Sequence, residues 1–411
     1  MILLLLEIIC VWLIVGNLIL LFSYRQALRQ FWLEPMVKQP IIIFESDDWG
    51  PGPAEHGQAL HKIHQLLTEF RDYRGHCAHM TIGAVLSIPD AEKIQQSQYQ
   101  AYAGLDLSQP QFSDVLGSLK QGQQAGVFSL QLHGREHYWP HTLLSEMQHN
   151  NDLKEWLAHN SAYTEKLPSP LQSRWNPPLS IADIAVAVKQ EVDLFKRCFG
   201  VAAEVVVPPT FVWNEEVEIS WRSHGIHTII TPGQRYYKRS ETRFWSDKKR
   251  IVNHQTSATG QTYLVRNQYF EPEFGHQWRE AIDKVTSSIK LARPCLFETH
   301  RFNFVNSEEG CQNSLYQMRS LLEQVTKTWP DCCFLSSLEL VRLPQHDPDK
   351  LLIHHWRHRL QCWRNRAFTL PKFRYLATLT GLNLACWLIV QVKPVTDFSL
   401  WQHQSDKPRS N

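Results

Sequence analysis

Five acidic and histidine residues stand where the chain leaves runs of apolar residues. In chain order they are Asp47 and Asp48, His133 and His137, and His300. Two imidazoles and one carboxylate suit Zn²⁺ or a similar divalent ion and leave coordination positions open. A second carboxylate beside a ligand can serve as a base towards water. These residue types therefore predict hydrolysis assisted by a metal ion.

Spacing alone does not select the histidine pair. The chain has 20 histidines and three pairs separated by four residues: His133/His137, His137/His141 and His354/His358. Position selects among them, because only His133 and His137 directly follow a strand-like run, as Asp47 and Asp48 do. We interpret His354/His358 as structural or interfacial.

The elements that must position these residues alternate between strand-like and helix-like segments. Short buried strands are expected at 41–44, 80–85, 127–132, 205–207, 228–230, 296–299 and 332–335. Helical periodicity covers 181–199, with Gly200 as its C-terminal cap, and also 278–291 and 314–326. Strand–helix alternation predicts an α/β fold with a parallel sheet, closed or nearly closed into a barrel. In such folds the working residues lie at the carboxyl ends of the strands.

This ordered set of motifs resembles the polysaccharide deacetylase family (NodB homology, carbohydrate esterase family 4) over roughly residues 38–345. The resemblance implies a distorted (β/α) barrel of the NodB type. It implies that Asp47 is the general base, that Asp48, His133 and His137 are the metal ligands, and that His300 is the general acid. The activity implied is removal of N-acetyl or related N-acyl groups from a saccharide, with zinc as the expected metal.

Two departures mark the chain as a divergent member. Gly134 stands where the family's second motif has Ser or Thr, and Val207-Pro208-Pro209 lacks the arginine of the third motif. That arginine would orient the base. Arg135 and Arg301 are candidates to replace it by position only.

Several residues near the strand ends are candidates to contact the substrate. They are Trp49, Pro209, Phe211, Trp213 and Arg301. Aromatic rings among them could stack on sugar faces, although core packing is an equally common use of such side chains.

The composition argues against nucleic-acid binding and against cysteine-based sites. A formal net charge of +2 over 411 residues gives no sign of nucleic-acid binding. The nine cysteines include no C-x-x-C pair, which predicts reduced thiols rather than a disulfide framework or a thiolate zinc site.

The two ends of the chain predict membrane attachment. Residues 2–22 form an apolar run long enough to cross a bilayer, without the features of a cleaved signal peptide, so we expect a transmembrane anchor over 1–24. Cations at Arg25, Arg29 and Lys38 favour a cytoplasmic catalytic domain, with an extracytoplasmic domain as the alternative. The basic tail, 350–411, contains a second apolar run at 376–392 that could span or lie in the interface. We expect a bacterial inner-membrane protein, whose substrate is a cell-envelope or lipid-linked glycan.

Two other functions compete with deacetylation. A glycosidase on a related barrel would use paired carboxylates, such as Asp47 with Glu215 or Glu298, and would leave the histidine pair unused. A non-catalytic glycan-binding or assembly protein would retain the fold without the activity. The missing third-motif arginine favours the latter, whereas the complete set of ligands, base and acid argues against it.

Overall fold

The computed structural model describes residues 2–176 and 179–391, which form two compact units. The larger unit comprises residues 39–289 and 293–351, and the smaller comprises 1–38, 290–292 and the described part of 352–411. The larger unit holds all five residues with predicted chemistry.

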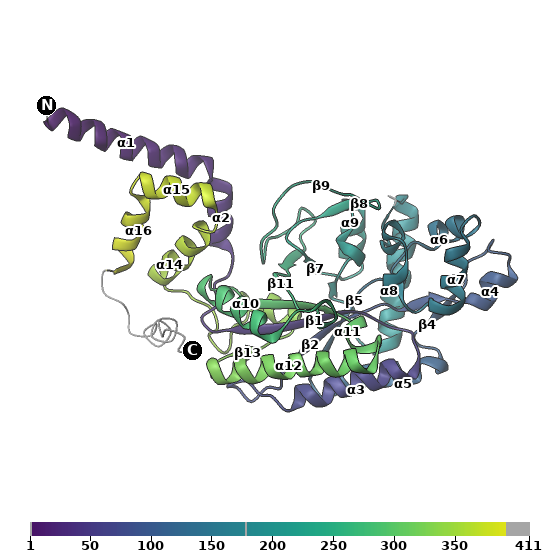
Figure 1. Ribbon diagram of the computed structural model, residues 1–411. Helices are drawn as coiled ribbons and strands as arrows, with labels where there is room; N and C mark the ends of the chain where they lie inside the picture. Colours follow the sequence, from purple (N-terminus) through teal and green to yellow (C-terminus); the bar gives the residue numbers. More distant parts are fainter. Residues whose placement is uncertain (1, 177–178, 392–411) are drawn as a thin grey trace. The chain divides into compact units, whose positions relative to one another are not determined.

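A nine-stranded sheet organises the larger unit (Figure 1), and every strand pair recorded within it is parallel. Its strands are β1 (Ile41–Trp49), β2 (Met80–Ala84), β5 (Phe128–Leu132), β6 (Val205–Val206), β7 (Thr228–Thr231), β10 (Thr262–Val265), β11 (Gln268–Tyr269), β12 (Cys295–His300) and β13 (Cys333–Phe334). Two antiparallel hairpins lie outside it: β3 (Ser87–Pro89) with β4 (Gly104–Asp106), and β8 (Tyr236–Arg239) with β9 (Phe244–Ser246).

The order of the strands leaves β10 and β11 as the two edges of a curled sheet. From β1 the chain adds β2, β5, β6, β7 and β10 as successive neighbours, while β11 and β12 return to the other side of β1. The edge strands β10 and β11 are not paired within the described residues, yet only Arg266 and Asn267 separate them. Such a connection spans about 10 Å at most, so the two edges must lie close together. The predicted α/β fold with a curled parallel sheet is confirmed.

Helices occupy the connections between the strands. They are α3 (Ala54–Thr68), α4 (Ala91–Gln96), α5 (Ser113–Gln124), α6 (Pro140–Met147), α7 (Asn151–Asn160), α8 (Ile181–Phe199), α9 (Glu215–Ser223), α10 (Trp278–Lys290), α11 (Phe302–Val305), α12 (Glu308–Thr328) and α13 (Ser337–Arg342). Short 3-10 turns lie at Pro110–Phe112, Thr164–Lys166, Ser169–Gln172, Pro209–Phe211 and Pro272–Phe274. Figure 1 shows α3, α5 and α12 along one outer side of the sheet.

Helix α8 shows how the local sequence sets the ends of an element. Ser180 accepts a hydrogen bond from the backbone N–H of Asp183 at its start, and Gly200 ends it with a φ of 73°. The left-handed backbone conformation at this position favours glycine, and the cap at Gly200 is the one predicted from the sequence.

The smaller unit is helical, with α1 (Ile2–Ser23), α2 (Arg25–Leu33), α14 (Trp356–Ala367), α15 (Pro371–Leu379) and α16 (Leu382–Gln391). Its centre is a buried guanidinium, Arg366, which donates to the carbonyls of Phe31, Glu34 and Ala292. A small apolar core formed by Leu20, Leu28, Phe31, Ala367, Phe373 and Ala377 joins α1, α2, α14 and α15.

Within the described residues, no single helix meets the length and apolarity expected of a membrane span. Two bent pairs meet them jointly: Val11–Ser23 with Arg25–Leu33, at 70°, and Pro371–Leu379 with Leu382–Val390, at 86°. The predicted run 376–392 is therefore broken between α15 and α16, and residue 392 lies outside the described part of the chain.

The four prolines at positions 168, 170, 177 and 178 predict a surface loop over 166–178. Leu171, Ser173, Arg174 and Trp175 are buried, so this prediction is wrong for 171–176. Pro177 and Pro178 lie outside the described residues.

Candidate metal centre and catalytic site

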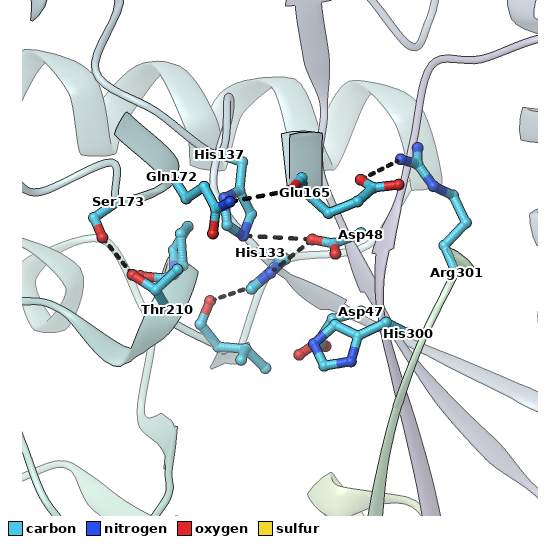
Figure 2. A network of polar contacts seen from close by, with 12 residues as sticks. Asp47, Asp48, His133, His137, Glu165, Gln172, Ser173, Thr210, His300 and Arg301 are labelled. Carbon is cyan, nitrogen blue, oxygen red and sulfur yellow. Dashed lines mark hydrogen bonds and ion pairs between the residues drawn. The ribbon is translucent and has the colours of Figure 1, made fainter. Parts of the chain in front are cut away.

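Asp48, His133 and His137 converge at the carboxyl ends of β1 and β5. Asp48 Oδ1 lies 3.3 Å from His133 Nε2 and 3.4 Å from His137 Nε2. All three residues are buried, and the three potential ligand atoms lie within 4.8 Å of one another. Figure 2 shows the two rings turned towards the carboxylate.

An irregularity in β1 directs the two aspartates. The register between β1 and β2 shifts between Ser46 and Trp49, and Asp48 has a φ of 70°. A bulge places consecutive side chains differently from regular strand alternation, and non-glycine residues with positive φ cluster at functional sites. Asp47 and Asp48 can therefore both serve one site.

The donor set fits a divalent metal ion. Among the described residues, nothing donates a hydrogen bond to the buried Asp48 Oδ1. A buried carboxylate oxygen without a partner costs free energy, and a bound cation would remove that cost. His133 Nδ1 lies 2.8 Å from the carbonyl oxygen of Val207, so a proton on Nδ1 leaves the Nε2 lone pair facing the site. Burial is the main cause that lowers the pKa of His137, to about 4, which keeps this ring neutral and able to ligate.

Asp47 is held by an arginine that the sequence did not identify. Arg266 Nη2 donates to Asp47 Oδ1 at 2.9 Å, Nη1 donates to Oδ2, and Nε donates to Glu45 Oε2 at 2.5 Å. Burial would raise the pKa of Asp47, but the charge and hydrogen bonds of Arg266, together with the charges of His133 and His300, outweigh it and the pKa falls below its ordinary value. Arg266 thus keeps Asp47 ionised and fixes its orientation, which is the role left open by the missing arginine.

The two positional candidates for that role are wrong. Arg135 pairs with Asp106 and Glu136 at 3.4 and 3.5 Å. Arg301 donates to the carbonyl of Ala162 at 2.5 Å. Arg301 also donates from its backbone N–H to the Asp47 carbonyl at 3.0 Å, but the Asp47 carboxylate is held by Arg266 rather than by either of these guanidiniums.

His300 is the last residue of β12 and faces the same cavity. Its Nδ1 lies 2.6 Å from Glu271 Oε1, and the side chain of Asn303 donates to the other oxygen of Glu271. Burial would lower the pKa of His300, but the hydrogen bond and charge of Glu271, together with the charges of Asp48 and Glu298, outweigh it and raise the pKa to about 10. His300 is therefore protonated at neutral pH and can donate a proton.

Replacing Glu271 with glutamine should shift the alkaline limb of kcat/KM to lower pH. The substitution removes the charge that raises the His300 pKa, so the acid form is lost at lower pH. Above the new pKa we expect a loss of roughly tenfold per pH unit. The pH–rate profile of Glu271→Gln is compared with that of Glu280→Gln, an exposed position on α10. Coincident alkaline limbs would show that Glu271 does not control the acid.

The reacting groups face a cavity of about 200 Å³. Its lining comprises Asp47, Asp48, His133, His137, Thr164, Glu165, Gln172, Val207, Pro208, Thr210, Phe211, Glu298, His300 and Phe302. Figure 2 shows Glu165 and Gln172 of the segment 162–173 beside the ligand residues.

Glu298 also belongs to this cavity, and it forms a second potential ligand group with Asp47 and His300. Burial outweighs the charge of Arg266 and raises the pKa of Glu298 to about 7. Because Arg266 already occupies both oxygens of Asp47, the group of Asp48, His133 and His137 fits a metal better.

Gly83 on β2 leaves the space that the Asp47 carboxylate fills. A Cβ at Gly83 would lie 2.2 Å from Asp47 Oδ1. We expect Gly83→Ala to lower kcat/KM by at least about 10²-fold, because displacing a reacting group by about 1 Å has an effect of that size. The control is Gly117→Ala, where a Cβ meets nothing within 4 Å. Equal activities of the two variants, both folded by circular dichroism, would contradict this account of Gly83.

A second buried ion network positions the histidine segment. Arg174 pairs with Glu136 at 2.6 Å and with Glu191 at 3.0 Å, and Glu136 lies between the two ligand histidines in sequence. Gly134 has a φ of 92°, and a Cβ there would lie 2.8 Å from the carbonyl oxygen of Glu136. The departure from the family's second motif therefore has a steric reason.

Most of the predicted substrate contacts are not available. Trp49 and Trp213 are fully buried and donate to Ser46 Oγ and Glu218 Oε1, so the prediction that they stack on sugars is wrong. Arg301 is buried against the segment 162–165, and Pro209 is buried; neither lines the cavity. Phe211 does line it, and its contact with substrate stays a prediction.

Sequence reasoning missed Arg266, Glu271 and Phe302. Arg266 and Glu271 follow the very short strands β10 and β11, which were not among the predicted strands. The available signal was the apolar run Tyr263-Leu264-Val265 directly before Arg266.

No protein-family model and no curated protein sequence matches the chain. Among solved structures, the chain is similar to a 4-alpha-glucanotransferase from Thermococcus litoralis, with a TM-score of 0.40 and 11% identity. The match covers 85% of this chain and 48% of the glucanotransferase, so the chain spans about half the length of that protein. It is similar to a putative polysaccharide deacetylase from Mycobacterium smegmatis, with a TM-score of 0.39 and 11% identity over 78% of this chain and 100% of that one. It is also similar to a family 4 carbohydrate esterase from Streptomyces lividans, solved with acetate, with a TM-score of 0.33 and 9% identity over 72% and 92% of the two chains.

Proposed function

We propose that this protein is a metal-dependent carbohydrate deacetylase, a divergent member of the polysaccharide deacetylase family. One observation carries the proposal: a metal-ligand triad, a carboxylate base held by arginine and a protonated histidine face one small cavity. Acyl transfer from nitrogen to water needs these three functions within reach of one carbonyl group.

Asp48, His133 and His137 would hold the divalent ion, with Zn²⁺ as the expected metal. When bound, the ion supplies Lewis-acid activation of the acyl carbonyl and of water. Asp47, kept ionised by Arg266, accepts the proton of the attacking water. His300, kept protonated by Glu271, donates a proton to the departing nitrogen. The products are a carboxylate, acetate for an N-acetyl group, and a free amino sugar.

Acetate release by the full chain tests this function. The purified protein is incubated with N-acetylated oligosaccharides before chelation, after chelation and after zinc is restored. Loss of acetate release on chelation and its return with zinc would support the proposal. Release that is unaffected by chelation, or absent with zinc present, would reject it.

The glycosidase alternative has less support. Glu215 is exposed at the start of α9 and does not line the cavity, so its pairing with Asp47 is wrong. Glu298 does lie beside Asp47, but both carboxylates are near the guanidinium of Arg266. Its Nη1 lies 3.6 Å from Glu298 Oε1. A glycosidase would also leave the triad without a role.

We further propose that the smaller unit attaches the protein to a membrane, with the catalytic unit in the cytoplasm. Exposed apolar side chains on α1 support attachment, among them Trp12, Leu18 and Phe22 at 59%, 63% and 67% exposure. The exposed cations Arg25 and Arg29 support the orientation. A glycan still joined to its lipid carrier would then be the substrate.

Labelling of a cysteine introduced at Lys166 tests this orientation. Lys166 is exposed and directly follows Glu165, which lines the cavity. A membrane-impermeant thiol reagent should label Lys166→Cys only after the cells are permeabilised. Labelling of intact cells beyond that of the unsubstituted protein would place the catalytic unit outside the cytoplasm.

A further inference from the structure

Two phenylalanines continue the wall of the cavity to the protein surface. Phe302 lines the cavity and stacks on His300, with ring centroids 5.6 Å apart and an interplanar angle of 12°. Phe274 contacts Phe302, with centroids 4.9 Å apart, and is 74% exposed. We call this pair the aromatic shelf.

The aromatic shelf rests on the backbone that also holds the general acid. Phe274 ends the 3-10 turn Pro272–Phe274, which begins directly after Glu271, the partner of His300. Gly275 closes the turn with a φ of 86°. Asn303 Oδ1 accepts a hydrogen bond from the backbone N–H of Glu273, while its Nδ2 donates to Glu271 and to the carbonyl of His300. The exposed ring is thus fixed relative to the reacting groups.

An exposed aromatic ring in this position needs an explanation. Single exposed apolar residues are common on protein surfaces. Phe274 differs because its ring continues, through Phe302, to a residue of the catalytic site. The cavity of about 200 Å³ holds little more than one acylamino group and part of a ring, so the rest of a glycan must lie outside it.

We propose that the aromatic shelf is a subsite for the sugar ring next to the one that carries the reacting group. This inference rests on the proposed function. The C–H face of an uncharged pyranose is apolar and flat enough to pack on Phe274, which would recognise the ring rather than its acyl group. The substrate class is therefore a neutral glycan of at least two units.

Calorimetric titration of the full chain in detergent tests the aromatic shelf. Cellotetraose and chitotetraose serve as probes, in an Asp47→Asn background that prevents turnover during the titration. Phe274→Ala should weaken both sugars by about tenfold, equivalent to roughly 1.4 kcal/mol, and Phe274→Trp should bind as tightly as the parent.

Tyr73→Ala is the matched control. Tyr73 is 45% exposed. Its neighbour Asp72 accepts a hydrogen bond from the backbone N–H of Phe334, which pairs with Ile42 near the start of β1. Tyr73 therefore lies near the amino ends of the strands, opposite the catalytic site. Its affinity should equal that of the parent. Equal affinity in Phe274→Ala, or no binding of either sugar by the parent, would overturn the inference.

Acetate release by the protein with Asp47 intact separates the two proposals. Binding that depends on Phe274 without acetate release would reject the deacetylase and leave the aromatic shelf as a glycan subsite. Acetate release together with sugar binding that does not depend on Phe274 would support the deacetylase and reject the aromatic shelf as a glycan subsite.

Discussion

His133→Ala should remove the bound divalent ion and lower kcat/KM by at least about 10³-fold. The substitution takes away one of three ligands, and the ion supplies several kcal/mol of transition-state stabilisation, with about 1.4 kcal/mol equal to a tenfold change in rate. Metal content by mass spectrometry and acetate release are measured on the same preparation.

His354→Ala is the control for this experiment. His354 is exposed and belongs to another histidine pair with four-residue spacing. It should retain metal and activity. If His133→Ala kept its metal, or if both variants lost it equally, Asp48, His133 and His137 would not form the metal site.

Arg266→Met should be the most destabilising of the substitutions considered. Its guanidinium is buried and pairs with Asp47 and Glu45, which are also buried. Removing one partner of a buried ion pair leaves uncompensated charge, so we expect a loss of about 3–5 kcal/mol in the free energy of unfolding. Activity should fall as well, because Asp47 loses both its orientation and the charge that lowers its pKa.

Chemical denaturation of the full chain, followed by tryptophan fluorescence, measures the loss. The control is Arg319→Met, which breaks an exposed pair with Glu69 and should change stability by no more than about 1 kcal/mol. A double variant, Arg266→Met with Glu45→Gln, should recover part of the stability because one buried charge is then absent. Similar losses in the two single variants would contradict the account of Arg266.

The sequence by itself determined which strands carry chemistry. Apolar runs marked β1, β5 and β12, and the residues at their carboxyl ends are the ones that the fold gathers: Asp47, Asp48, His133, His137 and His300. This succeeded because parallel strands direct their carboxyl ends to one edge of the sheet, so order along the chain converts into proximity. The cap of α8 was equally readable because it depends only on local backbone geometry.

The tertiary structure alone decided what surrounds these residues. Arg266 lies 219 positions from Asp47 in the chain and reaches it because it lies just before β11, which is joined to β1 through β12. Glu271 is brought beside His300 by the pairing of β11 with β12, whose last residue is His300. β11 consists only of Gln268 and Tyr269 and contains no apolar run, so nothing in the sequence marks Glu271 as following a strand.

The direction of side chains was the other undetermined feature. Trp49 follows Asp48 directly but is fully buried, because the bulge in β1 changes which way consecutive residues point. Phe274, far from any predicted motif, is the exposed ring beside the site. Residue type and spacing thus fix which chemistry is available, whereas burial and orientation depend on contacts between segments distant in sequence, which the sequence pattern does not encode locally.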